Sequence, residues 1–223
     1  MKPPAHEHEF EAAHGLPEAL PAGERILWQG APQWRVLAVQ VMHVRTLAVY
    51  FALMLLWRAV TAFYDGGGLS GALLSVALLA PLAVLALGIL SYLAWLTSRT
   101  TVYTVTNRRI VMRIGIVLSV TFNLPYRMLD AASMRLNRDG SGDLSLLLAP
   151  GERIAYANLW PHARPWQVKR SQPMLRAIPE AARVGEVITN AMAAVAEIER
   201  KVPAARPQAV STTSTGQGHA LAA

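Results

Sequence analysis

Two long apolar runs dominate the pattern of hydrophobic and polar residues along this chain. They cover residues 46–64 and 70–96, and a short polar link, Asp65-Gly66-Gly67-Gly68, joins them. The first run contains one charged residue, Arg58, and the second contains none. A helix needs roughly 20 apolar residues to cross the ~30 Å hydrocarbon core of a bilayer, and a helix satisfies its own backbone polar groups there. The pattern therefore predicts a transmembrane hairpin of two helices within residues 36–98.

After the second apolar run, the period of the pattern changes from that of a helix to that of a strand. β-Branched and aromatic residues alternate through 102–106, and turn residues separate the short runs that follow. Short strands with turns between them favour a small antiparallel β-barrel or sandwich. The predicted strands cover residues 101–106, 110–114, 117–124, 128–136, 144–148 and 153–159. A further strand at 24–28, within residues 23–35, precedes the hairpin and needs this sheet as its partner.

An amphipathic helix is predicted at the C-terminal end of this domain. Apolar residues recur at spacings of three and four between residues 180 and 201, with Pro179 and Pro203 at its two ends. The apolar stripe can close one side of the barrel. Residues 1–22 and 203–223 are expected to be largely disordered tails. The predicted fold class is a membrane protein of α+β structure, in which residues 99–202 form a small cytoplasmic antiparallel β-barrel or sandwich closed by the terminal helix.

The formal charge of +7 is distributed so that it predicts the orientation of the chain in a membrane. Arg35 and Arg45 precede the first run, whereas the link between the runs carries only Asp65. Under the positive-inside rule we expect both termini in the cytoplasm and the chain in a bacterial inner or intracytoplasmic membrane. Basic residues beside a bilayer attract anionic lipids. The residues expected at the membrane surface are Arg45, Arg99, Arg108, Arg109 and Arg113.

Two residues within the apolar runs are unusual for a membrane span. Arg58 lies about 9 Å from the outer end of its predicted helix, at 1.5 Å per residue. Its side chain can therefore reach the interface, with help from Asp65. The alternative is an acidic or carbonyl partner for Arg58 on another membrane protein. Pro81, in the second run, is expected to kink its helix.

Groups that could carry out chemistry are few and scattered. The chain has no Cys, which excludes thiolate ligands and nucleophiles, and it has no G-x-S-x-G motif. The tract His6-Glu7-His8-Glu9 is interpreted as a polar tail rather than a metal site, because nothing fixes its geometry. No His lies within 46–96, and His43 at the edge is interpreted as a solvated residue rather than a pigment ligand. We therefore expect a binding protein, with no catalytic site, cofactor or metal.

A basic, proline-rich segment at residues 161–179 is the main candidate for protein docking. Protein interfaces favour Trp, Met and Arg over Lys, and this segment combines those residue types. The residues expected to bind a partner are Arg164, Trp166, Lys169, Arg170, Met174 and Arg176. Nucleic acid is not expected as a partner, because membrane topology already accounts for the positive charge.

The strand and turn residues carry a resemblance to a known domain. The matching segments are Tyr103-Thr104-Val105-Thr106-Asn107-Arg108-Arg109-Ile110-Val111, then Gly115, then Gly140-Ser141-Gly142-Asp143. They resemble the bacterial pleckstrin-homology (PH) domain of membrane proteins in which a helical hairpin interrupts the start of the domain. Gly23-Glu24-Arg25-Ile26-Leu27-Trp28 matches the strand before that hairpin, so the resemblance covers roughly residues 20–200.

More narrowly, the chain resembles the PuhB family of photosynthetic complex assembly proteins of purple bacteria. The matching residues are Gly15-Leu16-Pro17-Glu18, Leu20-Pro21, Gly23-Glu24, His43-Val44-Arg45, Ala163-Arg164-Pro165-Trp166 and Gln172-Pro173-Met174-Leu175-Arg176. The resemblance implies a non-enzymatic membrane factor that helps the reaction centre assemble, with a secondary effect on the core light-harvesting complex. Its implied partners are reaction-centre subunits and core light-harvesting polypeptides, together with anionic lipids.

Two alternatives stay open from the sequence. The same domain could belong to a general membrane-anchored lipid-sensing or envelope-stress protein. The helix at 180–201 could also pair in a homodimer, although its single apolar stripe is already needed to cover the barrel.

Overall fold

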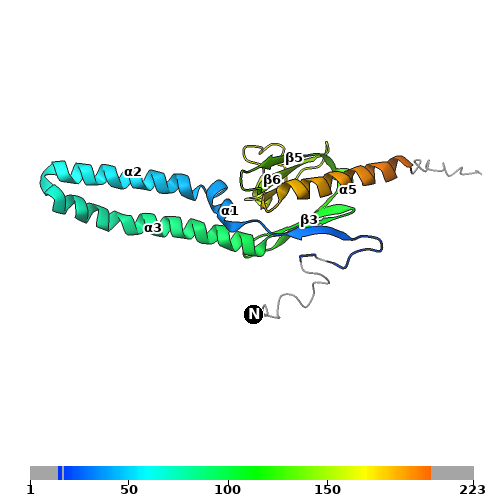
Figure 1. Cartoon of the computed structure of the whole chain (residues 1–223), viewed down its shortest axis with the longest axis horizontal. Coiled ribbons are helices and arrows are strands. Elements are labelled where there is room, and N and C mark those ends of the chain that lie inside the picture. The colour runs from blue at the N-terminus through cyan, green and yellow to red at the C-terminus, as the bar shows by residue number, and fades with distance from the viewer. Residues whose placement is uncertain (1–14, 17, 202–223) are drawn as a thin grey trace, which may run out of the picture.

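A strand, two long helices and a second series of strands follow one another along the chain (Figure 1). The structure is a computed structural model that describes residues 15, 16 and 18–201. The elements before the second series of strands are β1 (Ile26–Gly30), α1 (Trp34–Gln40), α2 (Val44–Ala62), the turn η1 (Phe63–Gly67) and α3 (Gly68–Thr100). Those that follow are β2 (Val102–Thr106), β3 (Arg109–Ile114), β4 (Val120–Pro125), η2 (Tyr126–Met128), β5 (Leu129–Leu136), β6 (Gly142–Leu148), α4 (Tyr156–Leu159), β7 (Met174–Ile178) and α5 (Ala181–Lys201). Most of the two tails predicted to be disordered, including the His-rich tract, lies outside the described residues.

The strands form two antiparallel sheets, with the orders β1-β2-β3-β4 and β5-β6-β7. β1 precedes the long helices and β2 follows them, yet the two strands pair, with Gly30 opposite Tyr103. β3 then runs back along β2, with Val102 opposite Arg113. The prediction of an α+β protein with small antiparallel sheets is confirmed.

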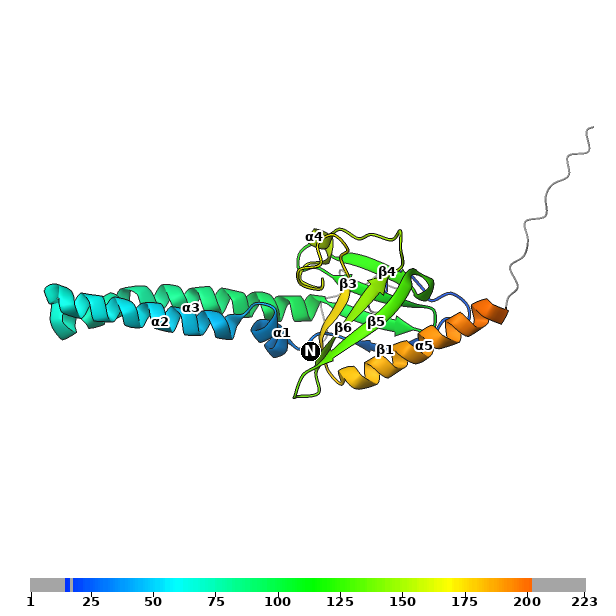
Figure 2. The ribbon, with the colours of Figure 1, turned by 90° about the horizontal axis from the view of Figure 1, so that it is seen from above.

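A hydrophobic core fills the space between the two sheets and α5. The first sheet contributes Val105 and Ile110, the second contributes Leu146, and α5 contributes Val184 and Ile188, all of them buried. α5 runs along the strands (Figure 2). It begins one residue after the predicted start and extends to Lys201, the last residue that the structure describes. The apolar positions of α5, which recur with the 3.6-residue period of a helix, therefore face the core.

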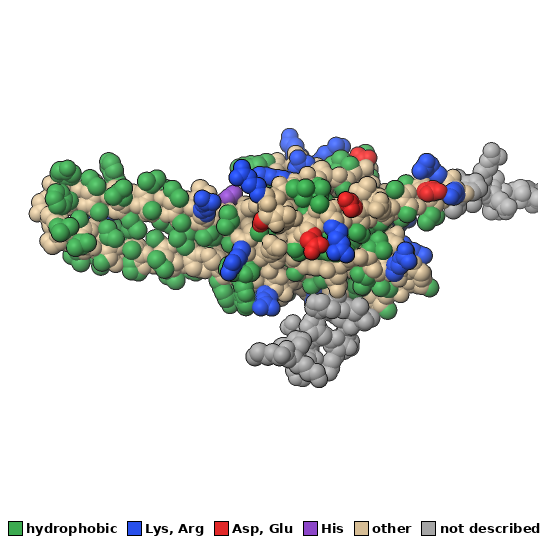
Figure 3. Space-filling view, in the orientation of Figure 1, with side chains coloured by type: hydrophobic (Ala, Val, Ile, Leu, Met, Phe, Trp, Pro, Cys, Tyr) green, Lys and Arg blue, Asp and Glu red, His purple; other side chains and the backbone are tan. Residues whose placement is uncertain are grey.

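The helices α2 and α3 lie side by side and project from one end of the sheets (Figures 1 and 2). The chain reverses direction at η1, where Gly66 has a φ of 95° that residues with a side chain rarely adopt. Apolar side chains cover the visible outside of both helices, with no Lys or Arg in view along most of their length (Figure 3). The helical stretch Val44–Thr100 is long and apolar enough to cross a membrane, by length and composition. We refer to α2, η1 and α3 as the helix pair, to the end of the sheets beside it as the proximal end, and to the opposite end as the distal end.

The short helix α1 connects the helix pair to the second sheet. Its buried Leu37 packs with Ala94 of α3 and Ala177, next to the end of β7. In the same region, Ser98 Oγ of α3 donates a hydrogen bond to Pro32 O at 2.7 Å. The helix pair is therefore fixed to the domain by side-chain packing as well as by the chain connections.

Two of the predicted strands need correction. The prediction of a strand at 153–159 is wrong, because that segment contains α4 and no strand. The third strand of the second sheet is instead β7, inside the basic, proline-rich segment 161–179 that is expected to dock a partner. All five residues of β7 are buried, so its sequence lacks the alternation that marks a strand with one solvated face. The strand expected at 117–124 begins only at Val120.

The two unusual residues of the apolar runs both lie on the helix pair. Arg58 is exposed on α2, and its Nη1 donates a hydrogen bond to Thr61 Oγ1 one turn further on, at 3.4 Å. Among the described residues, Arg58 forms no ion pair with Asp65. Pro81 lies within α3, which is helical on both sides of it.

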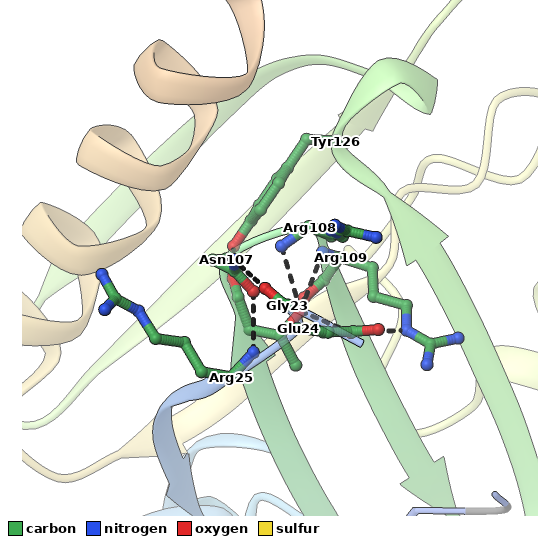
Figure 4. Close-up of polar contacts among 8 residues, drawn as sticks. Gly23, Glu24, Arg25, Asn107, Arg108, Arg109 and Tyr126 are labelled. Atoms are coloured by element: carbon green, nitrogen blue, oxygen red, sulfur yellow. Dashed lines mark hydrogen bonds and ion pairs between the residues drawn. The ribbon is translucent and has the colours of Figure 1, made fainter. Parts of the chain in front are cut away.

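A cluster of polar residues at the distal end joins the chain before the helix pair to the chain after it (Figure 4). Glu24 Oε1 accepts hydrogen bonds from Thr106 Oγ1 and from Arg109 Nε, both at 2.8 Å. Glu24 is 9 % exposed, so this ion pair is shielded from water on the carboxylate side. We call residues 23–25 together with 106–109 the clamp.

Asn107 completes the clamp, because its side-chain amide forms hydrogen bonds with backbone groups as a neighbouring strand would. Its Oδ1 accepts a hydrogen bond from Arg25 N–H at 2.9 Å, and its Nδ2 donates one to Gly23 O at 3.0 Å. Thr106 Oγ1 accepts hydrogen bonds from the backbone N–H groups of Arg108 and Arg109, which shapes the turn between β2 and β3. The Thr-Asn-Arg-Arg motif therefore holds β1 in the sheet.

The clamp leads to a stability prediction. Glu24→Gln removes the charge that Arg109 and Thr106 contact, and we expect it to lower the free energy of unfolding by about 2 kcal/mol, since hydrogen bonds to charged groups contribute roughly 1.5–3 kcal/mol. The matched control is Glu180→Gln, whose ion pair with Arg183 has both side chains at least 70 % exposed and should contribute little. Urea unfolding of the full-length protein in detergent, followed by tryptophan fluorescence, measures both. Equal effects of the two changes would contradict a stabilising clamp.

Candidate functional site

The register of the first sheet decides which residues lie beside the helix pair. β2 starts two residues after α3 ends and runs away from it for five residues, about 16 Å at 3.3 Å per residue. β3 returns, so Arg113 lies opposite Val102 at the proximal end. The turn between β2 and β3, which contains Arg108, lies at the distal end.

This register corrects the predicted group of membrane-surface arginines. Arg108 and Arg109 are close to the second apolar run in sequence, but they lie at the distal end, where Arg109 is held in the clamp. Arg113 is at the other end of β3, beside the helix pair. Arg45 and Arg99 belong to the helices α2 and α3 at their domain ends, and the guanidinium of Arg99 lies over the ring of Trp95.

An exposed apolar loop lies at the proximal end. It connects β3 to β4 and carries Ile116, Val117 and Leu118, of which Val117 is 91 % and Leu118 is 82 % exposed. Gly115 begins the loop with a φ of 122°, and a side chain at this position would collide with the Leu118 carbonyl oxygen. The loop therefore depends on glycine to turn and to present two adjacent aliphatic side chains beside the helix pair.

The structure divides the predicted docking residues into two sets. Arg164, Trp166, Lys169 and Arg170 are exposed in the loop before β7, and Trp166 is 96 % exposed. Met174 and Arg176 are buried in β7 at 7 % and 8 % exposure. The prediction that Met174 and Arg176 form a docking surface is therefore corrected, because both side chains belong to the interior of the domain.

The exposed loop has fixed ends. Arg164 N–H donates to Gln172 O at 3.0 Å, and Arg164 Nη1 donates to Gln172 Oε1 at 2.9 Å. Ala163 and Pro173 form an antiparallel bridge just inside this pair. The exposed residues 165–170 therefore form a loop with a narrow base, in which Trp166 has a φ of 65°. Ser171, next to the base, is buried and donates a hydrogen bond to Ile154 O. We call residues 164–172 the Trp166 loop.

A buried histidine anchors the base of this loop to the start of β2. His162 is fully buried, and its Nδ1 lies 2.6 Å from Tyr103 OH, while its Nε2 lies 3.3 Å from Thr101 Oγ1. Tyr103 OH also accepts a hydrogen bond from Arg176 N–H at 3.2 Å, so its own proton is directed at His162 Nδ1. The Nε2–H of a neutral imidazole then donates to Thr101 Oγ1.

Burial determines the charge state of the His162 imidazole. Desolvation, helped by the positive charge of Arg176, lowers the pKa of His162 to about 3, so the imidazole is neutral at physiological pH. Burial raises the pKa of Tyr103, which keeps its hydroxyl protonated as the donor. No local sequence pattern indicates this group, because its members come from three separate segments and meet only in the folded chain.

The comparisons with known proteins agree with this architecture. A family model described as "Bacterial PH domain" matches residues 36–192, and the chain belongs to this family of bacterial PH domain proteins. It is also 33 % identical, over 218 residues, to a Rhodobacter capsulatus protein described as an uncharacterized 23.7 kDa protein in the puhA 5′ region. That alignment covers 97 % of this chain and 98 % of the relative, and it agrees with the resemblance to PuhB-like proteins. No solved structure matches the chain.

The neutral histidine leads to a prediction about pH. The unfolded chain binds a proton at His162 below pH 6.5 and the folded chain does not until about pH 3, so stability falls as the pH is lowered through this window. Between pH 7 and pH 5 the loss from this group is about 2 kcal/mol. We expect His162→Gln to be less stable at pH 7 but to lose less stability on acidification. His43→Gln, at an exposed position, is the control. Parallel pH profiles of His162→Gln and the wild type would contradict a buried neutral imidazole.

Proposed function

We propose that this chain is a non-enzymatic membrane assembly factor for a bacterial photosynthetic reaction centre, with a secondary effect on the core light-harvesting complex. The observation that carries the proposal is the end-to-end similarity to a protein described by its place in the puhA 5′ region, because puhA is a reaction-centre gene. The alignment covers nearly the whole of both chains, so it includes the helix pair as well as the PH domain. Bacterial genes that lie beside the genes of a complex commonly encode proteins that serve that complex. The position of the relative's gene therefore favours a role in assembly over a general lipid-sensing or envelope-stress role.

The proposed membrane anchor is the helix pair. α2 has 19 residues and α3 has 33, which correspond to about 28 Å and 50 Å at 1.5 Å per residue. α2 nearly matches the thickness of a hydrocarbon core of ~30 Å and falls within the range of about 17–25 residues for a membrane span, and α3 exceeds that thickness. The surplus length of α3 is at its domain end, where Ala94 packs against α1. Tyr92 and Trp95 are exposed near this level, and Phe63 and Tyr64 are exposed at the other end, as interfacial aromatic residues would be.

The orientation follows from the charges at the two ends of the helix pair. The reversal at η1 carries Asp65, whereas Arg45, Arg99 and Arg113 lie at the domain end. We infer that the domain and both termini lie in the cytoplasm, in the inner or intracytoplasmic membrane. The aliphatic loop at Val117 and Leu118 then faces the lipid surface, beside arginines that attract anionic headgroups.

The Trp166 loop is the proposed docking surface for reaction-centre subunits. It combines one nearly fully exposed Trp with Arg164, Lys169 and Arg170, and Trp and Arg are the residue types that contribute most to binding energy at protein interfaces. Its base is fixed by hydrogen bonds and by His162, so ordering the loop on binding costs little conformational entropy. Its position at the proximal end favours contact with the cytoplasmic ends of membrane subunits.

A pull-down from membranes of a phototrophic host tests the docking surface. We expect the double change Trp166→Ala and Arg170→Ala to reduce recovery of reaction-centre polypeptides at least about tenfold, because single hot-spot residues contribute 2 kcal/mol or more. The matched control, Arg183→Ala, removes an exposed arginine from α5 and should leave recovery unchanged. Equal recovery with the double variant present in the membrane at wild-type level would exclude this loop as the docking surface.

A further inference from the structure

A pocket of about 680 Å³ lies between the junction of α1 and α2 and the base of the Trp166 loop. Its walls include Gln40 and His43 from the junction, Trp160 and Trp166 from the loop region, and Arg135 and Arg176 from the second sheet. No Asp or Glu is among the described residues that line it. The pocket is therefore positively charged, partly aromatic and open at the proximal end.

Arg176 is a buried cation without a matching anion. It is 8 % exposed, its Nη1 donates one hydrogen bond, to Pro161 O at 3.1 Å, and its Nε is buried with no partner. Within the described part of the chain it forms no ion pair. Asp143 lies in this region, but its Oδ1 accepts a hydrogen bond from Ala177 N–H at 2.8 Å. Burying a charge without a partner is unfavourable, so this guanidinium is expected to gain from an anion supplied by a ligand.

The second arginine lies on the exposed strand β5. Arg135 lines the same pocket, its residue is exposed, and it lies opposite Asp143 of β6. Two guanidinium groups, one buried and one exposed, are well suited to a phosphate group, which accepts several charge-assisted hydrogen bonds. Trp160, which is 59 % exposed, adds an apolar wall next to them. The pocket thus matches an anion that carries an apolar part.

The position of the pocket indicates which molecule supplies that anion. His43 is the residue just before α2, the point at which the chain enters the helix pair, so the pocket opens where lipid headgroups lie if the helix pair spans a membrane. We propose that this pocket binds the phosphate group of an anionic glycerophospholipid, with Arg176 and Arg135 contacting the phosphate and Trp160 contacting the glycerol region. The proposal rests on the membrane anchor of the proposed function, and does not depend on the reaction centre as partner.

Native mass spectrometry of the full-length protein in a neutral detergent tests the site, with phosphatidylglycerol as the probe and phosphatidylcholine as the neutral comparison. We expect phosphatidylglycerol to bind the wild type and Arg135→Gln to bind it about tenfold more weakly, the effect of one lost charge-assisted hydrogen bond. Arg176→Gln should weaken it at least as much. Arg127→Gln, which removes an exposed arginine from η2, should bind as the wild type does.

Three results would overturn the proposal. The first is equal phosphatidylglycerol binding by the wild type and Arg135→Gln, a surface change that should leave the fold intact. The second is complete displacement of the lipid by an equal concentration of inorganic phosphate, which would indicate a free-phosphate site. The third is displacement by an acidic peptide that binds more tightly than the lipid. Each readout uses purified protein, so failure of the wild type to recover reaction-centre polypeptides from membranes, while it still binds phosphatidylglycerol, would contradict the proposed function alone.

Discussion

The pairing of β1 with β2 is the interaction on which the rest of this structure depends. The two strands are neighbours in the sheet although α1 and both long helices lie between them in sequence. Closing so long an insertion costs conformational entropy, and the side-by-side packing of α2 and α3 lowers that cost by returning the chain to its starting point. The clamp between Glu24, Thr106 and Arg109 then holds the returning ends together. Without it, the first sheet would lose its outer strand and the helix pair would lose one of its two attachments.

The same pairing determines what the domain presents beside the helix pair. Because β2 leaves directly from α3, the β3–β4 loop, the Trp166 loop and the pocket at Arg176 all gather at the proximal end. His162 ties the Trp166 loop to Thr101 and Tyr103 at the start of β2, so the loop is positioned relative to the helices. In the proposed membrane orientation, the proximal end of the domain contacts both lipid and protein partners, and the clamp at the distal end stabilises the fold.

The sequence predicts the elements whose residue types or spacing are distinctive and misses those that combine polar residues with burial on every side. Helix α5 is predicted to begin within one residue of its start, because it has one buried face with a regular period. Strand β2 is predicted from its unbroken run of β-branched and aromatic residues, although four of its five residues are buried. Strand β7 was missed, since both of its faces are buried and its Arg176 made it resemble a surface loop. Arg108 and Arg109 were assigned to the wrong end, because distance along the chain does not reveal the direction of a strand. The His162 network and the unpaired Arg176 depend on contacts between distant segments, which no local pattern encodes.

The proposed role in reaction-centre assembly is tested most directly by the reaction-centre content of membranes from an in-frame deletion of the gene in a phototrophic host. Near-infrared absorbance of isolated membranes, normalised to total protein, gives that content, and a plasmid copy of the gene provides the control. We expect a several-fold loss of reaction centre in the deletion strain, a smaller loss of core light-harvesting complex, and recovery of both with the plasmid copy. Normal reaction-centre content with altered envelope behaviour would contradict a role in assembly.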